Sequence, residues 1–240
     1  MKNKIFIIVI TLCSLSCATK KEINYFQDLN NISNVSNFQD LNINVGDILD
    51  IQISSINPES LQIFQPHTQS AISQNNLQSR QTNGYLVDMN NFIYLPVLGK
   101  INTVGLTTIT LSREIEKKLS PFIKKPTVKT RILNFKISIL GEVNNPNTFN
   151  IIEERISIPQ ALGLAGDLTI NGDRKNIILL RNTDNKQIST IIDLTKSNFT
   201  NSEFFYLAQN DIIYVPPNTA KVKSSGLVGN VGTLTSVLSL

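Results

Sequence analysis

The order of apolar and polar residues between positions 84 and 128 predicts a run of short strands. Tyr85–Asp88 and Phe92–Val97 are rich in β-branched and aromatic residues, which favour strands. Asn90 and Asn91 lie between these runs, and asparagine tolerates the positive φ of a tight turn. The pattern therefore predicts a β-hairpin, followed by glycine turns around a further short strand.

A helix is predicted directly after these strands. Apolar residues recur at helical spacing on one face, at Leu111, Ile115, Leu119 and Phe122. Thr107 is a suitable N-cap, and Pro121 and Pro126 end the pattern. Most charged residues fall on the opposite face, so the helix is expected to cover a sheet with its apolar face. The region is predicted to be a small α+β module.

Strand patterns also precede this module. Apolar and polar residues alternate along Leu41–Val45, and a turn at Gly46-Asp47 separates this run from a second one at Ile48–Ile53. Residues 54–83 are rich in Gln, Ser and Asn, which predicts a long loop between the first strands and the module.

The second half of the chain has a similar mixture of strands and one short helix. Strands are predicted at four runs, Phe135–Leu140, Thr148–Ile151, Asn176–Arg181 and Ile188–Leu194, the last two around a turn at residues 183–185. Ser157 and Gln160 form a capping box with a proline in the first turn, which opens a short helix that Gly166 can end. A second α+β unit is expected here.

Two asparagines stand at turn positions in this half. Asn147 follows Pro146 and can occupy the left-handed position of a type II turn. Asn210 precedes Asp211 in the run Leu207–Val215, which repeats the earlier arrangement of a turn that ends in aspartate before a strand. We expect the aspartate side chain to cap each of these turns.

The first 17 residues are typical of a bacterial signal peptide. Lys2 and Lys4 precede an uncharged apolar run, Ile5–Leu12, which is too short to be a transmembrane helix. Residues 14–17, Ser-Leu-Ser-Cys, then resemble a lipobox, with serine where leucine is usual, and this predicts lipid attachment at Cys17. The alternative is ordinary secretion with cleavage near Ala18.

Cysteine usage favours the lipoprotein interpretation. Cys13 and Cys17 are the two cysteines of the chain, so the body after the signal region contains no thiol that could form a disulfide. Several acyl chains on Cys17 would hold the protein firmly, at about 0.8 kcal/mol per buried CH₂. Ala18 follows the cysteine, and resemblance to Gram-negative lipoproteins then implies sorting to the outer membrane.

Charge gives little indication of a charged partner. The chain has 22 basic and 18 acidic residues, a net charge of +4, and its basic residues are scattered rather than clustered with aromatic side chains. This pattern argues against a nucleic-acid groove.

Five motifs in order resemble the polysaccharide export (Wza-like) outer-membrane lipoproteins. All five lie in the first half of the chain. They are residues 45–47 with the following strand, residues 85–88, Leu95–Gly99, Gly105–Thr107 before the helix and Pro126–Val128 after it. The run from Gly141 to Asn147 resembles the start of the ligand-binding β-grasp (SLBB) domain that follows the export domain in that family. The resemblance covers roughly Leu41 to Pro217.

The residue patterns and the resemblance together predict an α+β chain with five segments. These are a signal peptide with lipobox (1–17), a tether (18–40), an export domain (41–133), one SLBB-like β-grasp domain (134–217) and a C-terminal segment (218–240). For the C-terminal segment we expect an outer-membrane helix, and the alternative is a frayed tail. In the last segment Leu227, Val231, Leu234 and Leu238 form an apolar stripe. Ser224–Leu240 would span about 24 Å as a helix, less than a typical hydrocarbon core of about 30 Å.

Enzymatic chemistry finds no support in the sequence. His67 is the single histidine and lies in the polar loop, so neither a zinc site nor a nucleophile–base pair is indicated. Glu153 and Glu154 are sequence neighbours and are expected to lie in a solvated turn rather than to face one bond. The glycines form no phosphate-binding motif. We therefore expect no catalytic residues, no metal and no cofactor.

The resemblance implies a subunit of a homo-oligomeric ring through which capsular or exopolysaccharide leaves the cell. Its implied partners are the polysaccharide cargo, the outer membrane and an inner-membrane chain-length regulator, often a tyrosine kinase. Two alternatives remain: a monomeric envelope lipoprotein that binds a soluble glycan through its SLBB-like module, and a periplasmic sugar-processing enzyme. Native mass separates the ring from the monomer, and the enzyme would need a carboxylate pair that the sequence does not identify.

Overall fold

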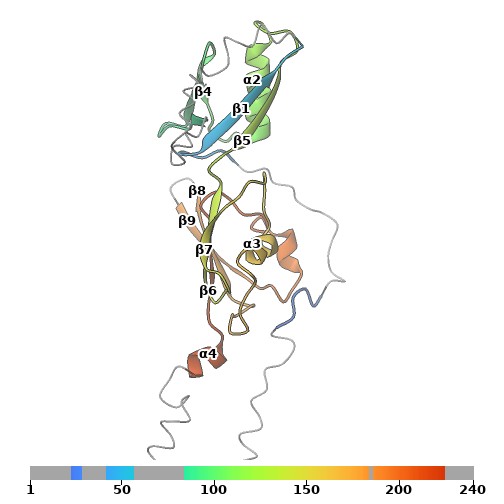
Figure 1. Ribbon diagram of the computed structural model, residues 1–240, viewed down its shortest axis with the longest axis vertical. Coiled ribbons are helices and arrows are strands. Elements are labelled where there is room, and N and C mark those ends of the chain that lie inside the picture. Colours follow the sequence, from blue (N-terminus) through green and yellow to red (C-terminus); the bar gives the residue numbers. More distant parts are fainter. Residues whose placement is uncertain (1–22, 29–41, 57–83, 184–185, 225–240) are drawn as a thin grey trace, which may run out of the picture.

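The computed structural model of the protein describes residues 23–28, 42–56, 84–183 and 186–224. These residues form two units, each with its own apolar core, that follow one another along the longest axis of the molecule (Figure 1). Both units combine antiparallel or mixed sheets with few helices, which confirms the predicted α+β class. The part of the chain that the structure describes contains no helix that is long and apolar enough to cross a membrane.

The first domain consists of a three-stranded sheet, a two-stranded hairpin and one helix. The sheet has the order β2-β1-β5, with β1 at Ile48–Ser54, β2 at Tyr85–Leu86 and β5 at Thr127–Ile132, all antiparallel. The hairpin pairs β3, Phe92–Leu95, with β4, Gly99–Asn102. Helix α2, Thr108–Leu119, packs on β5.

The hairpin prediction was wrong in its pairing. The expected turn is present, because Asn91 has a φ of 59° and its amide donates to the Asp88 carbonyl at 3.0 Å. However, β2 pairs with β1, while β3 pairs with β4. The physical reason is that β1 offers β2 a free edge, whereas a second turn at Val97, with a φ of 67°, brings β4 back onto β3.

Helix α2 begins as predicted but ends earlier. Thr107 is its N-cap, and the Thr107 side chain accepts from the Thr110 amide. Three of the expected apolar positions are fully buried: Leu111, Ile115 and Leu119. Phe122 was expected on the same face, but it is 60% exposed, whereas the next residue, Ile123, is 2% exposed. The helix stops at Leu119, so helical spacing no longer applies there.

The second domain is built on a five-stranded sheet of order β7-β6-β10-β8-β9. Its strands are β6, Lys136–Gly141, β7, Asn147–Asn150, β8, Ile177–Thr183, β9, Lys186–Ile192, and β10, Ile212–Val215. Strands β6 and β10 run parallel, and the other pairs are antiparallel. Further elements are α3, Ile158–Leu164, the 3₁₀ helix η4, Asn198–Asn201, and α4, Thr219–Ser224.

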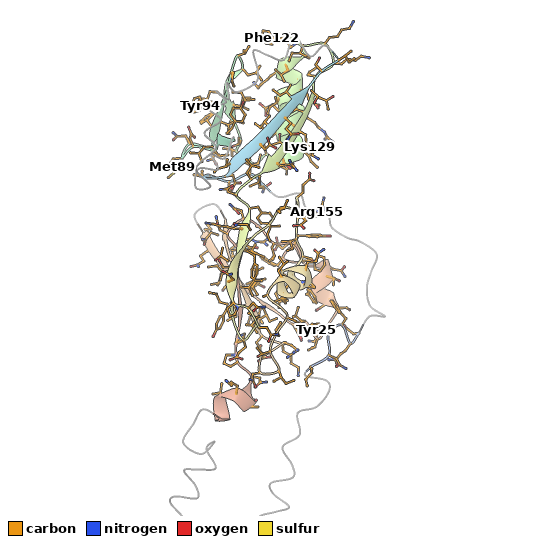
Figure 2. The ribbon with its side chains drawn as sticks, in the orientation of Figure 1. Tyr25, Met89, Tyr94, Phe122, Lys129 and Arg155 are labelled. Carbon is orange, nitrogen blue, oxygen red and sulfur yellow. The ribbon has the colours of Figure 1, made fainter. Side chains whose placement is uncertain are left out.

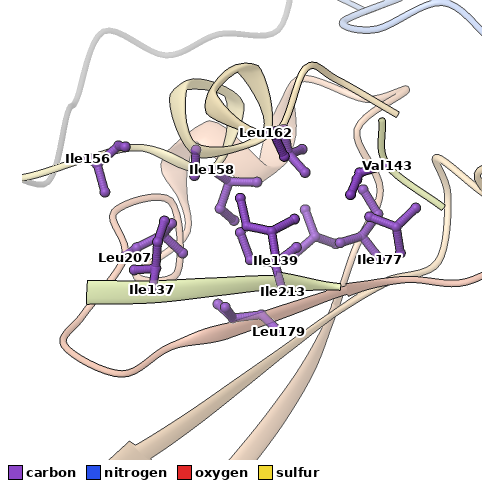
Figure 3. Packing of buried hydrophobic residues seen from close by; sticks show 14 of the residues in the cluster. Ile137, Ile139, Val143, Ile156, Ile158, Leu162, Ile177, Leu179, Leu207 and Ile213 are labelled. Atoms are coloured by element: carbon purple, nitrogen blue, oxygen red, sulfur yellow. The ribbon is translucent and has the colours of Figure 1, made fainter. Parts of the chain in front are cut away.

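Helix α3 covers one face of this sheet (Figure 3). Ile137, Ile139 and Ile213 lie on the sheet and meet Leu162 of α3 in the core. The capping box of Ser157 and Gln160 is confirmed, because each side chain bonds the backbone amide of the other residue. A short helix cannot supply its own stability, so its burial on the sheet holds it in place.

The prediction that Asn147 adopts a left-handed turn conformation was wrong. Asn147 pairs with Ile139 as the first residue of β7, and the positive φ in this motif is at Gly141, at 92°. Gly141 is the last residue of β6, so the residue with the left-handed backbone conformation is the glycine at which the chain leaves the sheet.

Residues 23–28 form a strap along the second domain, although residues 18–40 were expected to be a tether. The amides of Phe26 and Gln27 donate to the carbonyls of Leu194 and Thr195 at 3.1 and 2.8 Å. The Phe26 ring stacks on Phe199 with a centroid distance of 5.6 Å. Part of the segment therefore packs on a folded surface.

The ends of the strap are held by side chains. The Tyr25 hydroxyl donates to Asp167. Burial raises the pKa of Tyr25, and this hydrogen bond raises it further. Asp28 accepts from the Ser197 amide, and this bond lowers the pKa of Asp28. Cys17, His67 and the segment 225–240 lie outside the described residues.

Candidate functional site at the junction of the two domains

Each domain contains a turn that an aspartate closes with its own side chain. Asp47 Oδ2 accepts from the Asn44 amide at 2.8 Å, and Asp211 Oδ2 accepts from the Ala208 amide at 2.7 Å. The preceding residues have positive φ, 85° at Gly46 and 64° at Asn210. The predicted capping role of both aspartates is confirmed. Val45 was expected to alternate inward as part of a strand, but it belongs to this turn and is 40% exposed.

The second-domain turn is also held by an arginine. Arg181 Nη2 donates to Asp211 Oδ2 at 2.7 Å, and Arg181 Nε lies 3.1 Å from Oδ1. Arg181 Nη2 also donates to the Tyr206 carbonyl at 2.9 Å. Burial raises the pKa of Asp211, although Arg181 counteracts part of this effect. The bidentate geometry makes this a buried, directional ion pair.

Asp47 is equally buried, at 1% exposure, but its polar partner is a backbone amide. Burial raises the pKa of Asp47 to about 6, and the bond from the Asn44 amide lowers it less. Ionising Asp47 therefore costs more free energy in the folded protein than in the unfolded chain.

The Asp47→Asn variant tests the raised pKa of Asp47 through the pH dependence of stability. Because the folded pKa lies above the ordinary value of 3.8, charging Asp47 lowers stability at high pH, and the loss disappears as pH falls from about 6 towards 4. Wild type should lose about 1 kcal/mol of unfolding free energy relative to the variant between pH 5 and 7.5. Urea unfolding of both proteins at the two pH values measures this difference. Parallel pH profiles would contradict it.

A chain of hydrogen bonds joins the two turns across the domain junction. Asn134 lies between β5 and β6, and its side chain donates to the Gly46 carbonyl at 3.0 Å and accepts from the Ile48 amide at 2.9 Å. Gln209 Nε2 donates to the Asn134 carbonyl at 2.8 Å, while Gln209 Oε1 accepts from the Lys136 amide at 2.8 Å. The junction is thus specified by side chains from both domains.

Beside this junction lies a small cavity of about 50 Å³. Its lining includes Ile109, Ile132, Phe135, Ile152 and Arg155. Lys129 of the first domain and Glu154 of the second approach to 3.9 Å nearby, and both are exposed; Figure 2 places Lys129 and Arg155 on the two sides of the junction. Ligand sites usually measure about 300–1,000 Å³, so the cavity suits a few waters rather than a sugar.

The residues that the sequence analysis weighed as site candidates lie in exposed positions or outside the described residues. Glu153 and Glu154 are exposed, in agreement with a solvated turn. Among the described residues no group of three or more His, Cys, Asp or Glu side chains is arranged to hold a metal. Sequence reasoning missed Arg181, Asn134, Gln209 and the strap, because each acts on a residue far away in the chain.

Comparison with known families matches both domains. The model of the polysaccharide biosynthesis/export protein family matches residues 35–133, and the model of the SLBB domain matches residues 135–215. The chain is therefore an export-domain protein with a following SLBB domain. The order of the two domains is the one that the motifs of the sequence indicated.

Two relatives carry the same name, EPS I polysaccharide export outer membrane protein EpsA. The protein of Ralstonia nicotianae is 31% identical over 147 residues, which are 58% of this chain and 38% of the relative. The protein of Ralstonia solanacearum is 29% identical over 102 residues, which are 41% of this chain and 27% of the relative. The matched region thus covers less than two fifths of either relative.

Proposed function

We propose that this protein is an outer-membrane lipoprotein and a subunit of a ring through which capsular or exopolysaccharide leaves the cell. The observation that carries the proposal is the export domain followed directly by an SLBB domain. The relatives are named outer membrane polysaccharide export proteins, which supports the same location and cargo for this chain. No chemistry is assigned to the protein, because its work is to provide a hydrated path.

The two-domain structure supports a passive scaffold. Both buried aspartates close turns, and the side chains of Asn134 and Gln209 at the junction bond backbone groups. The partners of the proposed channel are further copies of this chain, the polysaccharide and an inner-membrane chain-length regulator. A native mass of one subunit in mild detergent would favour the monomeric glycan-binding lipoprotein instead.

Deletion of the protein tests the export function. A strain without it should make normal polysaccharide precursors but display none on its surface, because only the exit path is lost. Immunolabelling of intact cells and of lysates measures surface and internal polymer separately, and a plasmid copy of the wild type should restore display. Normal display in a deletion strain with no redundant homologue would count decisively against export.

Lipid attachment at Cys17 is a separate prediction. The signal-like apolar run ends at this residue, and the body contains no other thiol. Wild type should incorporate a labelled fatty acid and sediment with outer membranes, whereas Cys17→Ala should do neither. Equal labelling of both proteins would refute the anchor. The segment 218–240 is proposed as a second membrane contact, packed as a helix among its neighbours in the ring.

A further inference from the structure

One surface of the second domain binds the strap, and we call it the strap site. It consists of Asp167, which follows α3, and of residues 194–199, which follow β9. The strap binds this site through backbone amides, through one stacked ring and through a carboxylate. Proteins usually recognise extended peptides in this way, with main-chain bonds for affinity and side chains for specificity. The strap therefore occupies its site as a peptide ligand would.

Two side chains of the strap contact buried groups of this site. Phe26 stacks on Phe199, which is 5% exposed, with 5.6 Å between the ring centroids and 23° between the ring planes. Asp28 accepts from the amide of Ser197, and the Ser197 hydroxyl donates to the Asp28 carbonyl at 3.0 Å. Ser197 is 1% exposed, so its amide and hydroxyl depend on these partners. The site thus selects a phenylalanine that is followed two positions later by an aspartate.

The sequence contains this ligand a second time. Residues 26–30 read Phe-Gln-Asp-Leu-Asn, and residues 38–42 read Phe-Gln-Asp-Leu-Asn again. The second segment keeps the phenylalanine and the aspartate that the strap site contacts in the first. Directly before the repeat the two segments differ, because Asn37 stands where the strap has Tyr25. The chain therefore carries two segments with the features that one site selects.

Tyr25 makes the strap the stronger of the two ligands. Its hydroxyl donates to Asp167, and the guanidinium carbon of Arg174 lies 5.6 Å from the centroid of its ring. An asparagine lacks the ring and the hydroxyl that make these contacts. A hydrogen bond to a charged group is worth about tenfold in affinity, so the strap should hold the site against the second segment within a single chain.

We propose that the strap site binds the second Phe-Gln-Asp segment, residues 38–40, of a neighbouring copy of this chain when its own strap is released. The strap is then an internal competitor that occupies the site in the single chain. The inference goes beyond the proposed function, because it assigns a contact between copies that requires neither a closed ring nor a particular cargo. Its failure would leave export untouched, since surface display measures export separately.

The neighbouring copy follows from the reach of the chain. The second segment ends two positions before Asn42, which pairs with Thr107 in the first domain. Two residues span at most about 7 Å. In Figure 2, Lys129 of the first domain and Tyr25 of the strap lie on opposite sides of Arg155 along the longest axis. The strap site of the same chain is thus out of reach while Asn42 is paired, so a second copy must supply the segment.

Peptide binding to a vacated site tests the ligand. Full-length protein with Tyr25→Ala, Phe26→Ala and Asp28→Ala loses the side chains that hold its own strap, while the buried core of the second domain keeps its residues. Circular dichroism checks that this vacated protein is folded. A fluorescent peptide of residues 36–42 should bind to it saturably in mild detergent, as measured by anisotropy. The same peptide with Phe38→Ala should not bind.

Asp167→Gly is the matched control on the protein. A glycine keeps the φ of 67° at this position and removes the acceptor of the Tyr25 hydroxyl. A peptide of residues 24–30 should bind the vacated protein about tenfold more tightly than the peptide of residues 36–42. Asp167→Gly should remove most of that advantage and leave the binding of residues 36–42 unchanged.

A photo-reactive residue tests the neighbouring copy. Two versions of the full-length chain with different affinity tags are expressed together, and one carries benzoylphenylalanine in place of Phe38. Irradiation should link it to residues 190–207 of the other version, as mapped by mass spectrometry. Tyr25→Asn gives the strap the residue of the second segment, so it should raise this link severalfold. Benzoylphenylalanine in place of Phe122, which is 60% exposed in the first domain, is the control and should give no such link.

Each other outcome would overturn part or all of the proposal. If neither peptide bound the vacated protein, the strap site would not be a peptide site. Binding of the 24–30 peptide alone would exclude the second segment as an occupant. Links confined to one chain, or no link in the Tyr25→Asn protein, would exclude the neighbouring copy. Equal linking from Phe38 and Phe122 would show proximity without recognition, which also contradicts the proposal.

Discussion

Replacing Gly141 with alanine should destabilise the second domain by at least about 3 kcal/mol. Gly141 has a φ of 92°, a conformation that costs other residues about 1–3 kcal/mol. A Cβ at this position would also lie 2.1 Å from the carbonyl oxygen of Val215. That oxygen accepts from the Glu142 amide at 2.9 Å, so moving it disturbs the parallel pairing of β6 and β10.

Gly163→Ala is the matched control for this substitution. Gly163 lies inside α3 with no atom within 4 Å of the position of an added Cβ. Alanine should therefore stabilise the protein there by about 0.5–1 kcal/mol through helix propensity. Urea unfolding followed by circular dichroism compares the two variants with wild type. If both substitutions changed the unfolding free energy in the same direction, the explanation from the positive φ of Gly141 would be wrong.

Removing the buried carboxylate of Asp211 should cost about 3–5 kcal/mol of unfolding free energy. Asp211→Ala leaves the Arg181 guanidinium, whose side chain is 14% exposed, without its opposite charge, and it also removes the cap from the Ala208 amide. Most of the loss is the cost of an uncompensated buried cation rather than the strength of the pair itself.

An exposed ion pair provides the control for Asp211. Glu114 lies 3.9 Å from Lys118 on α2, with both side chains at least one third exposed, so Glu114→Ala should change stability by no more than about 0.5 kcal/mol. Double substitution of Arg181→Met and Asp211→Ala should recover part of the loss, because no buried charge remains. Equal losses in the single and double variants would contradict this explanation.

The features that could be read from the sequence are those in which a residue acts on its near neighbours. Thr107 and Ser157 cap helices through residues three positions away, and Asp47 and Asp211 close turns of the same length. Such chemistry depends on spacing along the chain, which the sequence gives directly.

Features that the sequence did not reveal depend on distant partners. Asn134 bonds Gly46 across 88 positions and Gln209 across 75, and neither asparagine nor glutamine indicates its partner by type. The pairing of β2 with β1 was missed for a similar reason, because the strand pattern around Asn91 fits either partner. Phe122 shows the limit of helical spacing, which holds only as far as the helix itself continues.

The strap has a mechanical consequence. Any pull on the chain at its N-terminal end reaches the folded body first through Tyr25, Phe26 and Asp28, which hold the second domain at Asp167 and along residues 194–197. The first domain begins at its own core only later in the chain, so it lies outside this path of tension while the strap is attached. Strain between a membrane anchor and the protein body would thus be borne by the SLBB domain, and the export domain would keep its shape.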